Sequence, residues 1–296
     1  MSEGTGTQIS STCGGGAEQN AGILDVLRFG VLSMFNTREA NTLRLVSKGF
    51  LSDVADHPWR DMQTVIQGYV GDQVGVRQGQ RGAWRACFPR AKYANITRGG
   101  TGFRRNSIID SDFVHLAGLE QLNMNYCTEI TDAAFVHLVG IQKLSMYACI
   151  NITDAAFVHL VGIKELNITC CYQITDIGIQ YIRGVRMLNM AHCYKITGAA
   201  FQYLDRVQEL SISGHNNPTI RDSDFTNLKE LEVLDMSSCQ RCRITKQVFE
   251  YIWRLKMLNI YQTNQITDED CEDLKIRFYR NPVEWSNLFK TSFISF

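Results

Sequence analysis

The sequence has no charge imbalance and no long apolar run. Lys plus Arg and Asp plus Glu number 30 each, so global charge points to neither a nucleic-acid nor a membrane partner. No run of 18 apolar residues is present, so we expect no membrane span. Residues 1–20 lack a basic start and an apolar core. We therefore expect a disordered leader instead of a secretory signal, and an intracellular protein of the cytoplasm or nucleus.

Catalytic and cofactor motifs are also missing. The sequence has no G-x-x-x-x-G-K-[ST] phosphate loop, and no pattern places a nucleophile beside a base and an orienting acid. His115, His137 and His159 recur at identical spacing, so stacked units would hold them in a row about 5 Å or more apart. A row of this kind does not form a metal cluster. We expect no enzyme, no cofactor and no metal site.

What the sequence does have is an internal repeat. The segment ITDAAFVHLVGI from Ile130 to Ile141 returns, letter for letter, from Ile152 to Ile163. The wider pattern I-x-D-x-x-F-x-x-L begins at Ile108, Ile130, Ile152, Ile174, Ile196, Ile220, Ile244 and Ile266. Its spacing is 22 residues, apart from two steps of 24. A fixed period in this range is typical of units that stack on copies of themselves.

Each repeat reads as a strand, a turn and a short helix. Apolar and polar residues alternate in Leu122-Asn123-Met124, which predicts a strand with one buried face, from Leu122 to Cys127. The following TDAAFVHLVG offers an N-cap at Thr131 or Asp132, one or two helical turns, and Gly140 to end them. One unit cannot bury enough apolar surface to fold alone, whereas stacked units bury each other's faces.

Five of the ten cysteines share one place in this pattern, five residues after the strand leucine. That column contains Cys127, Cys149, Cys171, Cys193 and Cys239, with His215 and Thr263 at the other two places. We expect reduced, structural thiols in the turn of the coil. Cys239 and Cys242 have C-x-x-C spacing without a second pair, so zinc is not expected there.

The repeat resembles the cysteine-containing leucine-rich repeats, in which C-x-x-I-T-D marks the turn from strand to helix. The resemblance covers Ile108 to about Ile276. It implies an α/β repeat solenoid, a horseshoe with a parallel concave sheet and short convex helices. The present repeats are shorter than the usual ones of that family, so the helices should be shorter too. We assign residues 108–276 to the repeats and 277–296 to a C-terminal cap or tail.

Residues 21–68 have a helical rhythm of apolar residues. Leu24, Leu27, Val31 and Phe35 are spaced by three, four and four, and Leu43, Val46, Phe50 and Val54 repeat that spacing. This spacing predicts amphipathic helices.

The segments VLSMF and LRLVSKGF, with Leu27 and Trp59, resemble the F-box, which docks the Skp-family adaptor of cullin-based ubiquitin ligases. The usual Leu-Pro opening is missing, and Phe50 stands where the family often has Trp. The resemblance implies an adaptor-binding set: Leu27, Val31, Leu32, Phe35, Leu43, Val46 and Phe50. The alternative is that these helices only cap the solenoid.

Residues 69–107 form a basic connector. From Gln73 to Ile109 there are eight basic residues and no acidic one. Such a segment suits an acidic ligand or a nucleic acid. A linker and N-terminal cap with solvated charges explains it as well, and because no nucleic-acid motif is present we favour that interpretation.

The strand residues that alternate with the core should face outward on the sheet. The outward column is polar throughout and aromatic residues lie beside it, a combination that is common in protein interfaces. The candidate target-binding residues are Asn123, Tyr126, Tyr147, Asn167, Asn189, His192, Asp235 and Tyr261. The alternative is that a sheet facing water is polar in any case.

The two resemblances together imply a substrate receptor of a cullin-type SCF ubiquitin ligase. It would act as a monomer within the complex and bind a protein target of unknown identity through its repeats. The alternative is a repeat scaffold or decoy with no ligase association.

Overall fold

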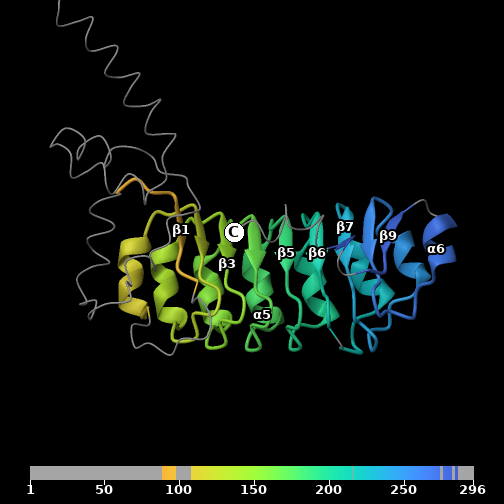
Figure 1. Cartoon of the computed structure of the whole chain (residues 1–296), viewed down its shortest axis with the longest axis horizontal. Coiled ribbons are helices and arrows are strands. Elements are labelled where there is room, and N and C mark those ends of the chain that lie inside the picture. The colour runs from red at the N-terminus through yellow and green to blue at the C-terminus, as the bar shows by residue number, and fades with distance from the viewer. Residues whose placement is uncertain (1–88, 98–107, 216, 274–275, 282–283, 286–296) are drawn as a thin grey trace, which may run out of the picture.

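The protein is described by a computed structural model over residues 89–97, 108–215, 217–273, 276–281 and 284–285. Nine short parallel strands form one sheet whose order follows the chain. In Figure 1 they stand side by side along the molecule, with the short helices lined up on one side of the sheet. The strands are β1 (Tyr93–Asn95), β2 (Gln121–Asn123), β3 (Lys143–Ser145), β4 (Glu165–Asn167), β5 (Met187–Asn189), β6 (Glu209–Ser211), β7 (Val233–Asp235), β8 (Met257–Asn259) and β9 (Arg277–Tyr279). This is the repeat solenoid with a parallel sheet that the sequence predicts.

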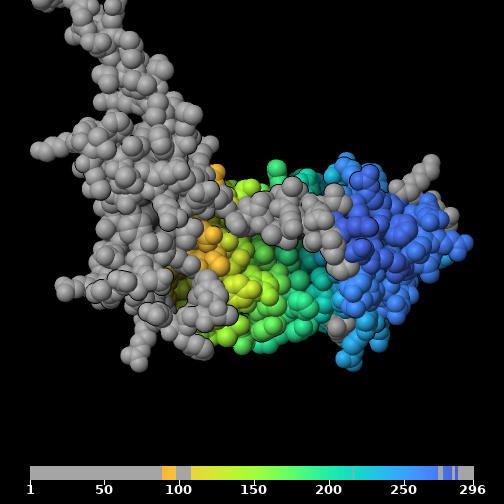
Figure 2. Space-filling view, in the orientation of Figure 1, coloured from red at the N-terminus to blue at the C-terminus, as the bar shows by residue number. Residues whose placement is uncertain are grey.

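Neighbouring strands pair in register, so that the strand leucines stack on one another. Leu122 pairs with Leu144, and Leu210 with Leu234. The 24-residue steps keep this register because their extra residues lie after the strand, in the loops that follow His215 and Cys239. Figure 2 shows the result as successive colour bands along one continuous elongated body.

The helices are short and mostly of the 3-10 type. They are η2 (Asp110–Leu116), η3 (Asp132–Leu138), η4 (Asp154–His159), α5 (Asp176–Ile179), η5 (Gln180–Ile182), η6 (Gly198–Tyr203), η7 (Asp222–Asn227), η8 (Lys246–Glu250) and α6 (Asp268–Asp273). A 3-10 helix rises about 2.0 Å per residue against 1.5 Å for an α-helix, so it spans the side of a short repeat with fewer residues. The Thr131 hydroxyl caps η3 by accepting the Ala133 N–H at 3.4 Å. Gly140 follows at a φ of 87°, as the sequence predicts.

Asp132, the other candidate cap, joins its repeat to the next one. Its two carboxylate oxygens accept the Thr153 N–H at 2.8 Å and the Thr153 hydroxyl at 2.6 Å. The same contact joins Asp110 to Thr131, Asp154 to Thr175, Asp176 to Thr197, and Asp222 to Thr245. We call this series the Asp–Thr ladder. Because each threonine also caps its own helix, the ladder couples the start of one helix to the start of the next.

The ladder is interrupted at Gly198, which occupies an aspartate place. A Cβ added at Gly198 would lie 1.8 Å from Oδ2 of Asp224, so only glycine leaves room for that carboxylate. Asp224 in turn accepts the Arg221 N–H at 2.8 Å. The start of η7 is therefore held by Asp224 of η7 itself and not by an aspartate of the preceding repeat.

One continuous core runs between the sheet and the helices, and the cysteine column is part of it. The thiols of Cys149, Cys171, Cys193 and Cys239 donate to carbonyl oxygens of the preceding repeat at 2.9–3.1 Å, and the Thr263 hydroxyl makes the same bond at 2.8 Å. Burial raises the pKa of Cys193 to about 12, so this thiol keeps the proton that it donates. The column thus has the structural role expected from its period.

Cys242 belongs to the same structural pattern, although it lies outside the column. Its thiol donates to the His215 carbonyl at 2.7 Å, and a parallel bridge joins Arg221 to Arg243. These contacts hold the two enlarged loops against each other, which accounts for the C-x-x-C spacing without a metal.

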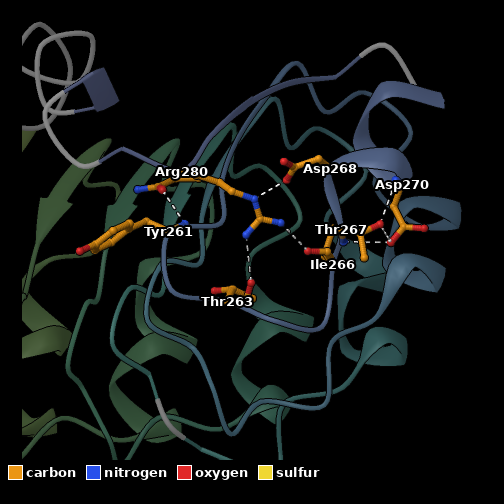
Figure 3. A network of polar contacts seen from close by, with 8 residues as sticks. Tyr261, Thr263, Ile266, Thr267, Asp268, Asp270 and Arg280 are labelled. Carbon is orange, nitrogen blue, oxygen red and sulfur yellow. Dashed lines mark hydrogen bonds and ion pairs between the residues drawn. The ribbon is translucent and has the colours of Figure 1, made fainter.

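The sheet extends beyond the expected repeat boundaries. β1 lies within the segment interpreted as a connector and pairs with β2, while β9 follows the last predicted repeat and pairs with β8. After β9, the Arg280 guanidinium donates to the Thr263 carbonyl at 3.3 Å and the Ile266 carbonyl at 3.0 Å, and it also contacts Asp268. Figure 3 shows Arg280 pointing into this network. Arg280 therefore supplies donors that a further repeat would otherwise provide.

The Asp–Thr ladder can be tested at Asp154, which accepts three hydrogen bonds from the next repeat: the Thr175 N–H, the Thr175 hydroxyl and the Gly178 N–H. We expect Asp154→Ala to lower the free energy of unfolding by about 1–3 kcal/mol, because two backbone donors lose a charged acceptor. Urea unfolding followed by circular dichroism measures this. Asp205→Ala removes an exposed aspartate outside the ladder and should change the value by less than about 0.5 kcal/mol. Equal effects at the two sites would contradict the structural role of the ladder.

Candidate protein-interaction face

The face of the sheet opposite the helices, here called the open face, carries parallel columns of side chains. The strand leucines point into the core, where Leu122 is 0% exposed, so the residues on either side of them point outward. The first column is Gln121, Lys143, Glu165, Met187, Glu209, Val233 and Met257. The second column is Asn123, Ser145, Asn167, Asn189, Ser211, Asp235 and Asn259.

The second column lies on the open face as predicted, but it is not freely exposed. Asn123 is only 5% exposed and Asn259 only 2%, while Asn167, Asn189 and Asp235 are half-buried. The side-chain oxygens of Asn123, Asn167, Asn189, Asp235 and Asn259 accept the N–H of the residue two places on, at 3.0–3.1 Å. The backbone therefore gives this column a reason to be polar that the sequence analysis did not include. These residues satisfy the backbone where the strand ends, and their contact with a target stays a prediction.

The same contacts explain why the strand is shorter than expected. The strand predicted from Leu122 to Cys127 pairs only over Gln121–Asn123, and the chain then turns through Tyr126 at a φ of 62°. The residues equivalent to Tyr126 also have positive φ: Ala148, Cys170, His192, Gly214, Ser238 and Gln262. A non-glycine residue in this conformation costs about 1–2 kcal/mol, yet glycine occupies only one of these places.

Gly214 is the place where glycine is required by packing as well. A Cβ there would lie 2.1 Å from the His192 ring. The glycine thus makes room for the imidazole, which also contacts the Tyr194 hydroxyl through Nδ1 at 3.0 Å. The predicted residue His192 is in this way placed against an aromatic neighbour that the sequence interpretation omitted.

Aromatic side chains gather where the strands of the first repeats end. We call Tyr126, Tyr147, Tyr172, His192 and Tyr194 the strand-end ridge. The rings of Tyr126 and Tyr147 meet edge to face with centroids 4.9 Å apart, and those of Tyr172 and Tyr194 are parallel at 6.0 Å. Tyr126 is 47% exposed. Exposed tyrosines held by their neighbours suit a protein interface, because little side-chain freedom remains to be lost on binding.

Tyr172 and Tyr194 were missed because they follow the cysteine column, in the turn and not in the strand. Their recurrence 22 residues apart is the signal that could have identified them.

Tyr147 is half-buried, and burial, with Cys170 and Tyr126 beside it, raises the pKa of its hydroxyl to about 12. It therefore remains a hydrogen-bond donor at all ordinary pH values. Tyr261 is half-buried at the far end of the sheet, away from the ridge.

The first column was also missed, and its character changes along the sheet. Lys143 and Glu165 form an ion pair at 2.6 Å, whereas Met187, Val233 and Met257 are apolar and half-buried. Those three residues pack against a small cluster made by Tyr279 and Trp285. The first column is thus polar over β2–β4 and, apart from Glu209 in β6, apolar over β5–β8, whereas the second column is polar along its whole length.

Asp235 lies in the second column, on the same strand as Val233. It accepts the Ser237 N–H at 3.0 Å and the Ser211 hydroxyl at 3.4 Å, and the Trp285 side chain bonds it as well. Burial nevertheless holds the pKa of Asp235 above its usual 3.8. A carboxylate in this position is costly unless it is well supplied with donors.

The helical side carries a separate apolar patch. Val114, Val136, Val139, Val158, Val161 and Ile177 are exposed there, and Trp253 is 69% exposed. Later repeats have polar or charged residues at the places of the valines, such as Gln180, Gln202 and Glu250. Nothing in the described part of the chain covers this patch, and we assign it no role.

The remaining sequence predictions concern metals, membranes and the adaptor. Over the described ranges, no group of three or more His, Cys, Asp or Glu side chains is arranged to hold a metal ion. His115, His137 and His159 are half-buried in a row on the helical side. No helix in the described part of the chain has the length and apolar character needed to cross a membrane. All seven predicted adaptor-binding residues, together with residues 1–68 and most of 69–107, lie outside the described residues.

The raised pKa of Asp235 predicts a pH-dependent stability difference. The folded state binds the proton more tightly than the unfolded state, so wild-type stability falls as pH rises from about 3.8 through the folded pKa. Asp235→Asn keeps the acceptor oxygen and removes the charge. The free energy of unfolding of the variant, minus that of the wild type, should therefore increase between about pH 4 and pH 7. Urea titrations at several pH values measure it, and a difference that does not change with pH would contradict the buried-carboxylate interpretation.

Comparison with known proteins identifies the fold and no closer relationship. No family model matches the sequence. No curated protein matches it either. Among solved structures, the TLR13–ssRNA13 complex matches at 18% identity and a TM-score of 0.50, covering 65% of this chain and 28% of that one. The Toll–Spatzle complex of Drosophila matches at 14% and 0.48, covering 58% and 24%, and the yeast Rad7–Elc1 complex at 16% and 0.40, covering 60% and 46%.

The chain spans less than half the length of each of these structures. At this level of identity the likeness concerns the fold alone. The matched chains are leucine-rich-repeat proteins, and they share with this chain a parallel sheet flanked by short helices. The described repeats of this protein have the leucine-rich-repeat fold.

Proposed function

We propose that the chain is the target-binding subunit of a cullin-type SCF ubiquitin ligase. The observation that supports target binding is the strand-end ridge, in which exposed tyrosines are held in fixed positions by the repeats. The F-box-like sequence of residues 21–68 is what associates this binding face with a ligase. The two parts occur in one chain, so a target and an adaptor would be held together.

The mechanism that we propose is tethering. The adaptor would bind the apolar set Leu27, Val31, Leu32, Phe35, Leu43, Val46 and Phe50, and the target would bind the open face and its ridge. Holding both partners on one chain raises the effective concentration of the target at the ubiquitin-charged enzyme, which increases the rate of transfer without any catalytic group in this chain. We therefore propose a binding protein and not an enzyme.

A second candidate is a repeat scaffold or decoy that binds a protein without any ligase. The sequence offers a specific reason for it: the Leu-Pro opening of the F-box is missing, and Phe50 replaces the frequent Trp. Both changes fall in the adaptor-binding segment and leave the repeats unaffected. In either case the cysteines of the described repeats are free and mostly buried, which agrees with the reducing cytoplasm or nucleus that we propose.

The adaptor can be tested by substitution of two apolar residues. We expect the wild-type chain to copurify with a Skp-family adaptor, and the double change Leu32→Asp and Phe35→Asp to abolish this by charging the contact surface. Circular dichroism of the variant should show that the repeats remain folded. Absence of copurification with the wild-type chain at micromolar concentration would eliminate the ligase proposal and leave the scaffold.

The target-binding face can be tested on a partner identified by capture with the full chain. Tyr147→Ala and Tyr194→Ala should each weaken its binding by about 1–3 kcal/mol, because each removes an anchor from the strand-end ridge. Isothermal titration calorimetry measures the affinity. Tyr181→Ala is the matched control, since Tyr181 is an exposed tyrosine on the helical side. A loss at Tyr181 with no loss at the ridge would place the binding face on the other side of the molecule.

A further inference from the structure

Trp285 lies on the open face and not in the main core. It is only 6% exposed, and its ring packs against that of Tyr279 with centroids 5.3 Å apart. Met187, Val233 and Met257 pack against this aromatic pair. These three residues come from the first columns of β5, β7 and β8, so the cluster extends over several repeats that precede the C-terminal segment.

The same place offers a polar contact to Trp285. The Trp285 side chain hydrogen-bonds the carboxylate of Asp235, in β7, and an indole has only its N–H to donate. We call Met187, Val233, Asp235 and Met257 the inner patch. The patch combines the apolar side chains of Met187, Val233 and Met257 with the Asp235 carboxylate as an acceptor, and Glu209 lies between Met187 and Val233 in the same column. Apolar contacts beside an acceptor match a flat aromatic side chain with a donor at its edge.

Capping the end of the solenoid does not explain this arrangement. An end cap has to satisfy the last repeat and cover its core. β9 pairs with β8, and Arg280 donates to the carbonyls of Thr263 and Ile266, as Figure 3 shows. Trp285 instead covers a face that the first repeats leave polar, with Gln121 and Lys143 at the equivalent places. The end of the solenoid is thus covered by β9 and Arg280, and the inner patch lies outside that cap.

We propose that the inner patch is a binding site for an aromatic side chain with an N–H or O–H donor, and that Trp285 occupies it within the chain. A target that presents such a side chain has to displace Trp285. This inference rests on the proposed use of the open face for target binding, whereas the occupation of the patch by Trp285 does not. Occupation lowers the apparent affinity of a competing ligand in proportion to the fraction of molecules whose patch is free.

A peptide of the chain's own residues 281–290 serves as the competing ligand. Fluorescence anisotropy measures its binding to the full-length chain. The Trp285→Ala chain should bind the peptide at least about tenfold more tightly than the wild type, which corresponds to a patch occupied in about nine molecules of ten. The peptide with Trp285→Ala should not bind. The peptide with Trp285→Phe should bind about tenfold more weakly, because it lacks the donor to Asp235.

Two matched controls separate the patch from general effects of substitution. Trp253→Ala removes an exposed tryptophan from the helical side and should leave peptide binding at the wild-type level. In the Trp285→Ala chain, Val233→Lys should abolish peptide binding, whereas Val139→Lys, the same change at an exposed valine of the helical side, should not. Circular dichroism verifies folding, and if Trp285→Ala disrupts it, the Trp285→Phe chain replaces it with an intermediate affinity expected.

Equal binding to the wild-type and Trp285→Ala chains would overturn the proposal, and so would absence of binding to a folded Trp285→Ala chain. This experiment requires neither an adaptor nor a target. Peptide binding as expected, in a chain that captures no partner, would therefore contradict the proposed function while leaving the internal occupation of the patch established.

Discussion

In-register hydrogen bonding between neighbouring repeats is the constraint on which the structure depends. A strand of three residues has little stability alone, so each one is held by the strands before and after it. Leu122 pairs with Leu144, and this register continues along the sheet. Every repeat must therefore place its strand leucine beside that of the preceding repeat. The Asp–Thr ladder applies the same requirement at the starts of the helices. Extra residues are tolerated only in loops that take part in neither the strand pairing nor the Asp–Thr ladder, and the two longer repeats have their extra residues in such loops.

The need to satisfy the backbone also decides which open-face residues are available for recognition. Second-column residues such as Asn123 and Asn259 are committed to the strand ends, and the cysteine thiols to carbonyls of the preceding repeat. Residues without such tasks remain at the strand-end ridge and in the first column. In the ridge, Tyr126 and His192 have a positive φ, a backbone conformation that is unfavourable for residues other than glycine. Residues that cost stability and serve no backbone group are the strongest candidates for binding.

The two ends of the open face differ in chemistry. Over β2–β4 it carries charged and polar side chains, and the strand-end ridge follows the ends of β2–β5, which suits a partner that approaches from water. Over β5–β8 three residues of the first column, Met187, Val233 and Met257, are apolar and in contact with the cluster of Tyr279 and Trp285. Under the proposal made above, a target that extends along the whole face displaces Trp285 when it reaches the inner patch.

The sequence by itself determined the fold, because stacking uses only local periodicity. The 22-residue period, the leucines such as Leu122, the cysteine column and the Thr131 cap were all readable, since each depends on neighbours one repeat away. Of the candidate residues, the sequence named Tyr126, Tyr147 and His192 of the ridge and omitted Tyr172 and Tyr194, and their contact with a target stays a prediction. The tertiary structure alone decided that Asn123 serves the backbone and that Trp285 lies on the open face. Trp285 belongs to no repeat and contacts residues far away in sequence, so no period could place it.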